Sequence, residues 1–203
     1  MHISYKRVHF LYKNNMKKIA VFASGSGTNA ENIAKYFAEK QDIMVSLAVS
    51  NHPQAGVHDR MNRLSIPSVT FSNEAFAAGS EIVKKMNEFQ IDWIILAGFL
   101  KKIPKTILNT YPDRIINIHP ALLPKYGGKG MYGMRVHEAV VAGGESESGI
   151  TIHYVNEHYD EGKIIFQARC PVLTSDTIYD VAAKVHALEY KHYPEVIEML
   201  INS

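Results

Sequence analysis

Short apolar runs alternate with amphipathic helical segments along the N-terminal part of the chain. The first pair is an apolar run at residues 18–23 and a segment in which Ala30, Ile33, Ala34 and Phe37 recur at helical spacing. Strands joined through helices pair in parallel, because each crossover returns the chain to the same end of the sheet. The pattern therefore predicts a parallel sheet with helices on both faces. Further strands are expected at residues 43–49, 69–71, 93–97 and 115–118, and further helices at residues 57–64, 74–89 and 105–109.

The C-terminal part of the chain departs from this alternation. Residues 150–155 and 163–168 predict two strands whose short connection favours antiparallel pairing. A last helix is expected after the capping sequence Ser175-Asp176-Thr177, and Pro194 is expected to kink or restart it. The expected fold is α/β, a doubly wound Rossmann-like sheet that is mostly parallel and ends in an antiparallel strand pair. Two more segments are a glycine-rich stretch without a defined element at residues 126–132 and a short helix at residues 134–141.

Composition limits the class of protein. The chain has 203 residues, 46% hydrophobic and 21% charged, which is typical of one globular domain. We assign residues 16–203 to that domain, and residues 1–15 to an N-terminal extension that we expect to be disordered. The net charge of +2 is not gathered in a basic stripe, so nucleic-acid binding is not expected. No apolar run reaches the roughly 20 residues of a membrane span, so no membrane partner is expected and a cytoplasmic location follows.

Cysteine and histidine patterns give no sign of a metal. Cys170 is the only cysteine, so neither an intrachain disulfide nor a cysteine metal cluster can form. Its apolar neighbours predict a buried structural thiol rather than a nucleophile. The sequence has no His-Glu-x-x-His motif, and His153 and His158 are not at the helical spacing of a metal pair. We therefore expect no metal.

A glycine-rich turn, Ser24-Gly25-Ser26-Gly27-Thr28-Asn29, follows the first expected strand and opens the first helix. Backbone N–H groups and the positive helix end suit such a turn to an anion, and Ser26, Thr28 and Asn29 can add side-chain hydrogen bonds. A tight turn or helix cap without a ligand is an open alternative. The spacing Gly25-x-Gly27-x-x-Ala30 also fits a dinucleotide fingerprint, but the second strand ends without the acid that would hold the ribose. The turn therefore suits a single phosphate better than a dinucleotide.

Asn117 and His119 lie at the end of the fifth expected strand, directly before Pro120. Side chains alternate along a strand, so the two point to the same face, and the proline ends the strand there. Ligands bind at the carboxyl ends of strands in parallel α/β sheets. A protonated histidine beside an amide can stabilise an oxyanion and move a proton. On these residues alone, a structural role for the pair is an equal alternative.

The loop at residues 156–162 carries a run of acidic residues, which is ordinarily a solvated turn. If Asp160 reached the sheet edge beside His119, it would favour the protonated imidazole. No serine stands in a nucleophile elbow. Direct attack by a substrate amine is therefore favoured over a covalent enzyme intermediate.

Four motifs in one order resemble the phosphoribosylglycinamide formyltransferases, which are folate-dependent enzymes of purine synthesis. The resemblance covers residues 16 to 203, almost the whole chain. The motifs are Ser-Gly-x-Gly-Thr-Asn at residues 24–29, Leu-Ala-Gly-Phe at 96–99, Asn-Ile-His-Pro-Ala-Leu-Leu-Pro at 117–124 and Asp-x-Gly at 160–162.

This resemblance implies a reaction and a set of site residues. The amine of glycinamide ribonucleotide would attack the formyl carbon of the co-substrate 10-formyltetrahydrofolate, and water would relay the proton. Asn117 and protonated His119 would stabilise the oxyanion, while Asp160 would keep His119 charged and oriented. The residues implied for the substrate phosphate and ribose are Ser26, Gly27, Thr28, Asn29 and Glu189. The residues implied for folate are Leu100, Lys101, Lys102, Ile103 and Asn117.

The chain departs from the resemblance in two places. Residues 73–76 lack the arginine that the family often has for the folate tail, and the loop at residues 126–134 is longer and richer in glycine than expected. Three alternatives stay open: 10-formyltetrahydrofolate hydrolysis, which needs no phosphate turn; a methionyl-tRNA formyltransferase, disfavoured because no RNA-binding domain follows residue 203; and a phosphate-binding protein without chemistry. The expected partners are the two small-molecule substrates, and monomer and homodimer are equally open.

Overall fold

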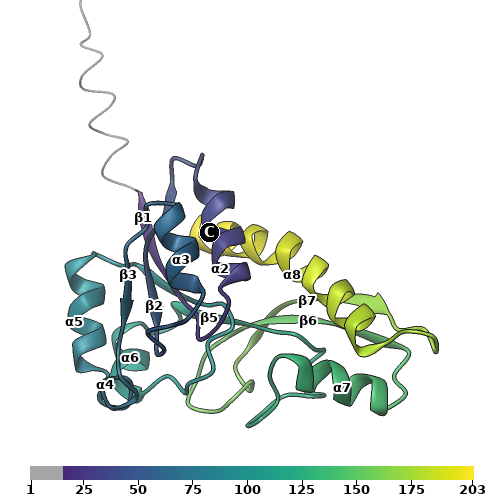
Figure 1. Cartoon of the computed structure of the whole chain (residues 1–203). Coiled ribbons are helices and arrows are strands. Elements are labelled where there is room, and N and C mark those ends of the chain that lie inside the picture. The colour runs from purple at the N-terminus through teal and green to yellow at the C-terminus, as the bar shows by residue number, and fades with distance from the viewer. Residues whose placement is uncertain (1–15) are drawn as a thin grey trace, which may run out of the picture.

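The computed structural model describes residues 16–203 (Figure 1). The expected disorder of residues 1–15 lies outside the described residues. One seven-stranded sheet runs through the molecule in the order β3-β2-β1-β4-β5-β6-β7. The first five strands pair in parallel, while β6 is antiparallel to both β5 and β7. The strands are β1 (Lys17–Phe22), β2 (Ile43–Ser50), β3 (Ser68–Thr70), β4 (Trp93–Leu96), β5 (Ile115–His119), β6 (Glu147–Tyr154) and β7 (Ile164–Pro171).

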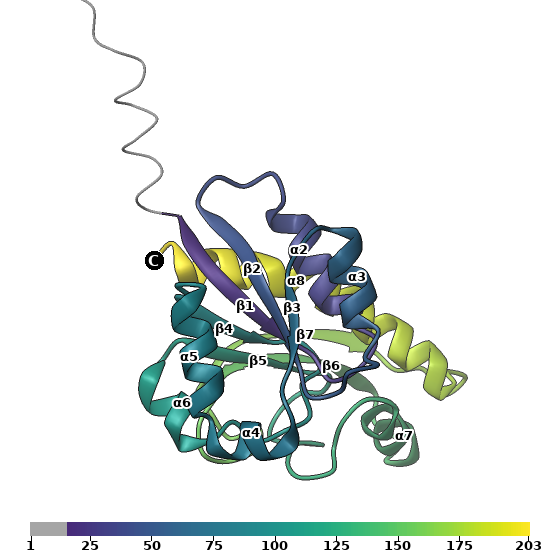
Figure 2. The ribbon, with the colours of Figure 1, turned by 60° about the vertical axis from the view of Figure 1, so that its left-hand side comes forward.

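Helices cover both faces of the sheet, as Figure 2 shows. Alternation along β1 explains the two cores: Ile19 and Val21 join the apolar cluster on one face, and Ala20 and Phe22 join the cluster on the other. The first cluster lies under α2 (Thr28–Phe37), α3 (Val57–Arg63), α7 (Met134–Ala142) and α8 (Ile178–Ile201). The second lies under α4 (Asn73–Ala78), α5 (Ser80–Glu88) and α6 (Lys105–Thr110). The predicted doubly wound, mostly parallel architecture is confirmed.

The single helix predicted over residues 74–89 is wrong, because it is two helices broken at Gly79. Gly79 has a φ of 77°, a left-handed conformation that ends α4 and begins α5. A Cβ at this position would lie 3.0 Å from Thr106 and 3.1 Å from Pro104. The break therefore lets the chain pass close to the start of α6, a contact distant in sequence.

Of the kink or restart predicted at Pro194, the restart does not occur, because α8 is one continuous helix through this residue. Proline has no N–H to donate to the carbonyl of residue 190, four positions earlier. In this chain Asn32 Nδ2, on α2, donates to the Tyr190 carbonyl oxygen at 2.8 Å. A neighbouring helix thus satisfies the carbonyl that the proline leaves unpaired. The N-terminus of α8 carries the predicted cap, a capping box between Thr177 and Asp180.

Candidate active site

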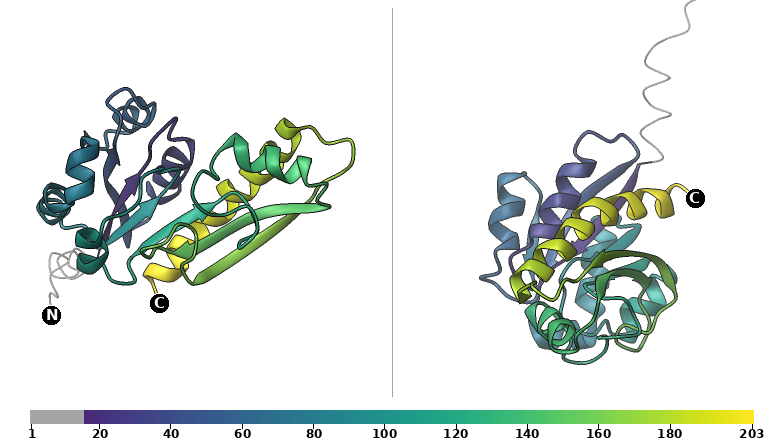
Figure 3. Two further views of the ribbon diagram at one scale, coloured as in Figure 1. Left: turned by 90° about the horizontal axis from the view of Figure 1, so that it is seen from below. Right: turned by 90° about the vertical axis from the view of Figure 1, so that its right-hand side faces the viewer.

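A cavity of about 540 Å³ lies at the carboxyl ends of β1, β4 and β5. This is where parallel α/β sheets bind ligands, since the loops after neighbouring strands converge there. Figure 3 shows α7 and α8 on the same face of β6 and β7. Residues of both helices line the cavity. The lining includes residues 25–29 after β1, 97–100 after β4, 117–120 at the end of β5, 128–133 before α7, and Asp160, His186 and Glu189.

The predicted phosphate turn forms one end of this cavity. Gly27 has a φ of 76° and is the N-cap of α2, with no side chain capping the first amides. Those amides are therefore free for an anion. A Cβ on Gly27 would lie 2.6 Å from the Cα of Val57, so only glycine lets α3 pack against the turn.

The Asn29 side chain contacts Glu189 on α8. Its Nδ2 donates to Glu189 Oε2 at 2.9 Å, while its Oδ1 is buried without a partner among residues 16–203. Burial raises the pKa of Glu189, and the hydrogen bond from Asn29 opposes that shift. The Asn29 side chain thus links the turn to Glu189, and the role of Asn29 toward a phosphate stays a prediction.

Asn117 and His119 both line the cavity, as their alternation on β5 predicts. Asn117 pairs across the strands with His153 on β6, and Asn117 Nδ2 lies 3.1 Å from His153 Nε2. His153 Nδ1 lies 2.8 Å from the Tyr154 carbonyl, which can only accept, so the proton is on Nδ1. His153 Nε2 is then an acceptor and fixes the amide group of Asn117 with its N–H toward the histidine.

Asp160 lies beside His119. Asp160 Oδ2 is 3.5 Å from His119 Nδ1, and Asp160 Oδ1 is 3.7 Å from His153 Nε2. The main-chain N–H of Gly128 donates to Asp160 Oδ2 at 2.8 Å. Burial by itself raises the pKa of Asp160, but His153 and His119, when protonated, and the hydrogen bond from the Gly128 amide favour its ionised form and together lower the pKa. Asp160 is therefore ionised beside the imidazole.

Burial and Asp160 act on His119 in opposite directions. His119 is 3% exposed, and burial lowers its pKa more than Asp160 raises it. The ring is thus uncharged at neutral pH. Its Nε2 donates to the Tyr126 carbonyl at 2.8 Å, which leaves Nδ1 as an acceptor facing the carboxylate. A proton added to His119 Nδ1 would be bound directly by Asp160.

The loop after His119 is held by two side chains that the sequence did not indicate. Thr151, opposite His119 on β6, donates to the Ala121 carbonyl at 2.7 Å and accepts from the Leu123 amide at 3.0 Å. Gln167 on β7 donates to Thr151 Oγ1 at 2.9 Å and to the Leu123 carbonyl at 3.1 Å. The antiparallel strands therefore fix the backbone that follows His119.

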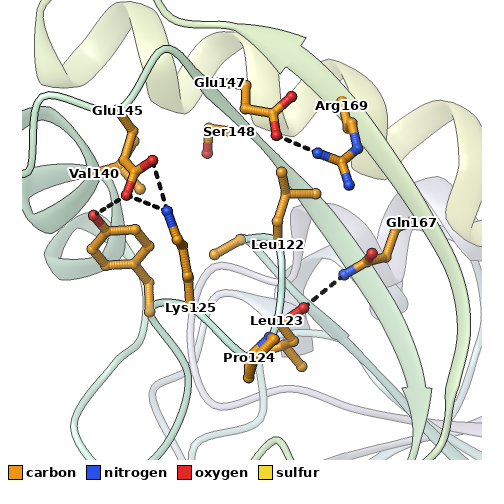
Figure 4. A pocket seen from close by; sticks show the side chains of 12 residues that line it. Leu122, Leu123, Pro124, Lys125, Val140, Glu145, Glu147, Ser148, Gln167 and Arg169 are labelled. Carbon is orange, nitrogen blue, oxygen red and sulfur yellow. Dashed lines mark hydrogen bonds and ion pairs between the residues drawn. The ribbon is translucent and has the colours of Figure 1, made fainter.

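The outer side of this loop forms a second cavity of about 250 Å³ (Figure 4). Its charged groups are already paired: Lys125 Nζ lies 2.9 Å from Glu145 Oε1, and Arg169 pairs with Glu147. Tyr126, whose carbonyl accepts from His119, donates its phenol to Glu145 Oε1 at 2.9 Å. The cavity thus backs the loop and anchors the residue that binds His119.

The residues predicted for folate are only partly in the main cavity. Leu100 lines it, with its amide donating to Ser24 Oγ at 2.9 Å. Lys101 and Lys102 are exposed outside the lining, and Ile103 is 3% exposed within the apolar core. Their role toward folate stays a prediction. Cys170 is half-buried among apolar side chains, and burial raises the pKa of its thiol.

His153 could have been found from the sequence, because the predicted hairpin places alternate residues of β6 opposite β5. Two other residues could not be predicted: Tyr126, whose carbonyl accepts from His119, and His137, which lines the cavity from α7. Neither the conformation of the glycine-rich loop nor the docking of α7 follows from local sequence pattern. Within residues 16–203, no three histidine, cysteine, aspartate or glutamate side chains are grouped as metal ligands would be. None of the helices described is long and apolar enough to cross a bilayer.

Comparison with known proteins places this fold and cavity in a class. The chain matches the formyl transferase family over residues 17–197 and belongs to that family. Relatives within it are named phosphoribosylglycinamide formyltransferase. The Bacillus subtilis protein of that name is 37% identical over 191 residues, which cover 92% of this chain and 95% of the relative. The chloroplastic protein of Vigna unguiculata is 40% identical, and the match covers 91% of this chain but only 61% of that longer relative.

Solved structures agree with this grouping. The phosphoribosylglycinamide formyltransferase of Streptococcus pneumoniae is 39% identical with a TM-score of 0.81, covering 91% of this chain and 99% of the other. The glycinamide ribonucleotide transformylase 1 of Symbiobacterium toebii is 30% identical with a TM-score of 0.85, covering 93% and 89%. The Rossmann-like fold predicted from the sequence is the fold of these proteins.

Proposed function

We propose that this chain transfers a formyl group from 10-formyltetrahydrofolate to the amine of glycinamide ribonucleotide, as in de novo purine (IMP) synthesis. The observation that carries the proposal is that Asn117, His119 and Asp160 line the same cavity as the turn at residues 25–29. Groups suited to an oxyanion and groups suited to a phosphate thus share one site. The names of the relatives support formyl transfer to phosphoribosylglycinamide.

In the proposed reaction the amine nitrogen attacks the formyl carbon, and the carbonyl electron pair moves onto the formyl oxygen. Asn117 Nδ2 and His119 Nε2 donate to that oxyanion. In the free protein His119 Nε2 donates to the Tyr126 carbonyl, so it exchanges one acceptor for another when the intermediate forms. A proton that His119 Nδ1 takes from solvent before the attack is bound by Asp160 and stays on His119 through the reaction, because the negative oxyanion favours the imidazolium.

Collapse of the intermediate breaks the bond between the formyl carbon and N10 of the folate. The electron pair of that bond stays on N10, which takes the proton that the attacking amine loses. Water in the cavity relays this proton. Asp160 therefore acts on His119 rather than on the substrate, and no bond to the protein forms at any step.

The test is to incubate the protein with a 10-formyl-folate analogue, with and without glycinamide ribonucleotide, and to follow folate absorbance. Turnover that requires the ribonucleotide supports the transferase. Turnover without it would identify a hydrolase instead, and no turnover in either mixture would identify a binding protein. His119→Asn should lower turnover by orders of magnitude with an unchanged unfolding temperature, and near-normal turnover would refute the assigned role of His119.

The proposal involves only small-molecule partners and no metal, nucleic acid or membrane. Lys101, Lys102 and Ile103 retain their proposed folate role through main-chain groups, which their exposed or buried side chains do not prevent. A cytoplasmic location, and a monomer or homodimer, are proposed with the same activity.

A further inference from the structure

Two buried polar atoms of the main cavity have no partner in the protein. Five buried side-chain atoms lack a hydrogen-bond partner among residues 16–203, and two of them belong to residues that line this cavity, Asn29 and His137. Buried polar groups in proteins are almost always paired, so each exception needs an explanation. In His137 only Nδ1 is fully buried; Nε2 has no hydrogen-bond partner within residues 16–203 either, so Nε2 is the ring nitrogen that is open to the cavity.

His137 is the less expected of the two. It lies on α7 after the glycine-rich loop, is 1% exposed, and its Nδ1 is the unpaired atom. Its ring centroid is 6.1 Å from that of His186 on α8, and His186 is one helical turn before Glu189. His137 therefore lies next to the α8 residues that line the same cavity, on the side where Glu189 contacts Asn29.

The tautomer of His137 is decided at Nδ1, where either an N–H donor or a lone-pair acceptor is left unpaired. An unpaired buried N–H is rarer in proteins than an unpaired acceptor, so the buried Nδ1 carries the lone pair and Nε2 carries the proton. The ring also stays neutral: burial, with smaller contributions from His186 and His119, lowers the pKa of His137 to about 4. His137 thus offers one donor, Nε2–H, and the group that it binds must be an acceptor.

We propose that His137 Nε2–H donates a hydrogen bond to an oxygen of the ribose–phosphate half of the substrate, as a further binding residue of the site. This inference rests on the proposed function. The ribose–phosphate half is favoured because Asn29, Glu189 and His186 lie at that side of the cavity, whereas Asn117 and Asp160 lie at the side of the transferred group. A neutral donor gives selectivity without attracting other anions as strongly as an arginine would.

Three substitutions distinguish the two ring nitrogens. The amide nitrogen of glutamine occupies nearly the place of histidine Nε2, and that of asparagine the place of Nδ1. We expect His137→Phe and His137→Asn to raise KM for glycinamide ribonucleotide roughly ten- to hundredfold, the value of one hydrogen bond to a charged group. His137→Gln should restore most of the affinity, and KM for the folate should stay within about twofold in all three. Equal KM values for the ribonucleotide in wild type and His137→Phe would overturn the inference.

Direct binding separates this inference from the proposed function. Calorimetry with ribose 5-phosphate should show the same fold-loss for His137→Phe as glycinamide ribonucleotide does. A loss seen only with the complete substrate would overturn the assignment to the ribose–phosphate half. A wild-type protein that binds neither compound would refute the proposed function itself. Should the variants fail to fold, nitrogen-15 NMR of the wild type decides: the Nε2–H tautomer must be present, and its signal must shift when ribose 5-phosphate is added.

Discussion

Replacing Asp160 with asparagine removes one charge from the site and changes almost nothing else. Asp160 has a φ of 58°, a left-handed conformation that asparagine adopts as readily as aspartate. The asparagine oxygen can still accept from the Gly128 amide, which donates to Asp160 at 2.8 Å. An alanine would lose that bond and strain the backbone as well. Asp160→Asn therefore isolates the effect of the carboxylate on His119.

The magnitude follows from the distance between the two side chains. For unit charges 3.5 Å apart, an effective dielectric constant of about 20 gives an attraction of roughly 5 kcal/mol. That attraction exists only while His119 carries a proton. Because His119 carries part or all of a full charge in the transition state, the attraction lowers the activation free energy by about 2–5 kcal/mol. At about 1.4 kcal/mol per tenfold change in rate, kcat should fall roughly thirtyfold to a few thousandfold.

The assay is steady-state kinetics with both substrates, together with thermal unfolding. Because Asp160 acts on His119 and not on the ribose–phosphate half, KM for the ribonucleotide should change less than threefold. Glu157→Gln is the matched control, since Glu157 lies in the same loop and forms an exposed ion pair with Lys105 at 3.0 Å; its kcat should stay within about twofold. A kcat for Asp160→Asn within threefold of wild type would refute the role of imidazolium in the transition state.

Three further predictions concern other parts of the site. Gly27→Ala should lower the unfolding temperature and raise KM for the ribonucleotide together, because its Cβ would lie 2.6 Å from the Val57 Cα at a φ of 76°; an unchanged unfolding temperature would contradict this packing. His153→Phe removes the acceptor that holds the Asn117 amide at 3.1 Å, so kcat should fall roughly tenfold with little change in KM, and an unaltered kcat would show that Asn117 needs no such support. The melting temperature should decrease as the pH falls from 6.5 to about 4, because burial lowers the pKa of His137 to about 4 and unfolding takes up a proton in this range. His137→Phe should decrease less steeply with pH. A curve parallel to that of the wild type would contradict the assignment of this pH dependence to His137.

The architecture could be predicted from local sequence pattern, because apolar residues repeat with one period in strands and with another in helices. The same alternation placed Asn117 and His119 on one face, and the register of β6 against β5 would have added His153. Contacts between distant segments were beyond local pattern. Gly79 breaks a helix because Pro104 and Thr106 lie close by, which no periodicity in residues 74–89 reveals.

The protonation of His119 depends on burial, which is a property of the assembled cavity. The sequence motif predicts that His119 lies at the end of a strand, but it does not predict the Tyr126 carbonyl that accepts from His119 Nε2. Tyr126 takes a φ of 56° in a loop where sequence indicates only an excess of glycine. Residues whose roles come from such loops, or from the docking of α7 on α8, had to be read from the structure.

The bond from Asn32 Nδ2 to the Tyr190 carbonyl makes position 32 depend on position 194. With proline at 194 that carbonyl needs an outside donor, whereas any other residue would supply its own N–H along the helix. We therefore expect the two positions to vary together among relatives, a side-chain donor at 32 accompanying proline at 194. Asn29, one turn earlier on α2, donates instead to the side-chain carboxylate of Glu189 on α8. Substitutions at the contact between α2 and α8 are thus restricted by the Tyr190 carbonyl that Pro194 leaves unpaired, as well as by the proposed substrate.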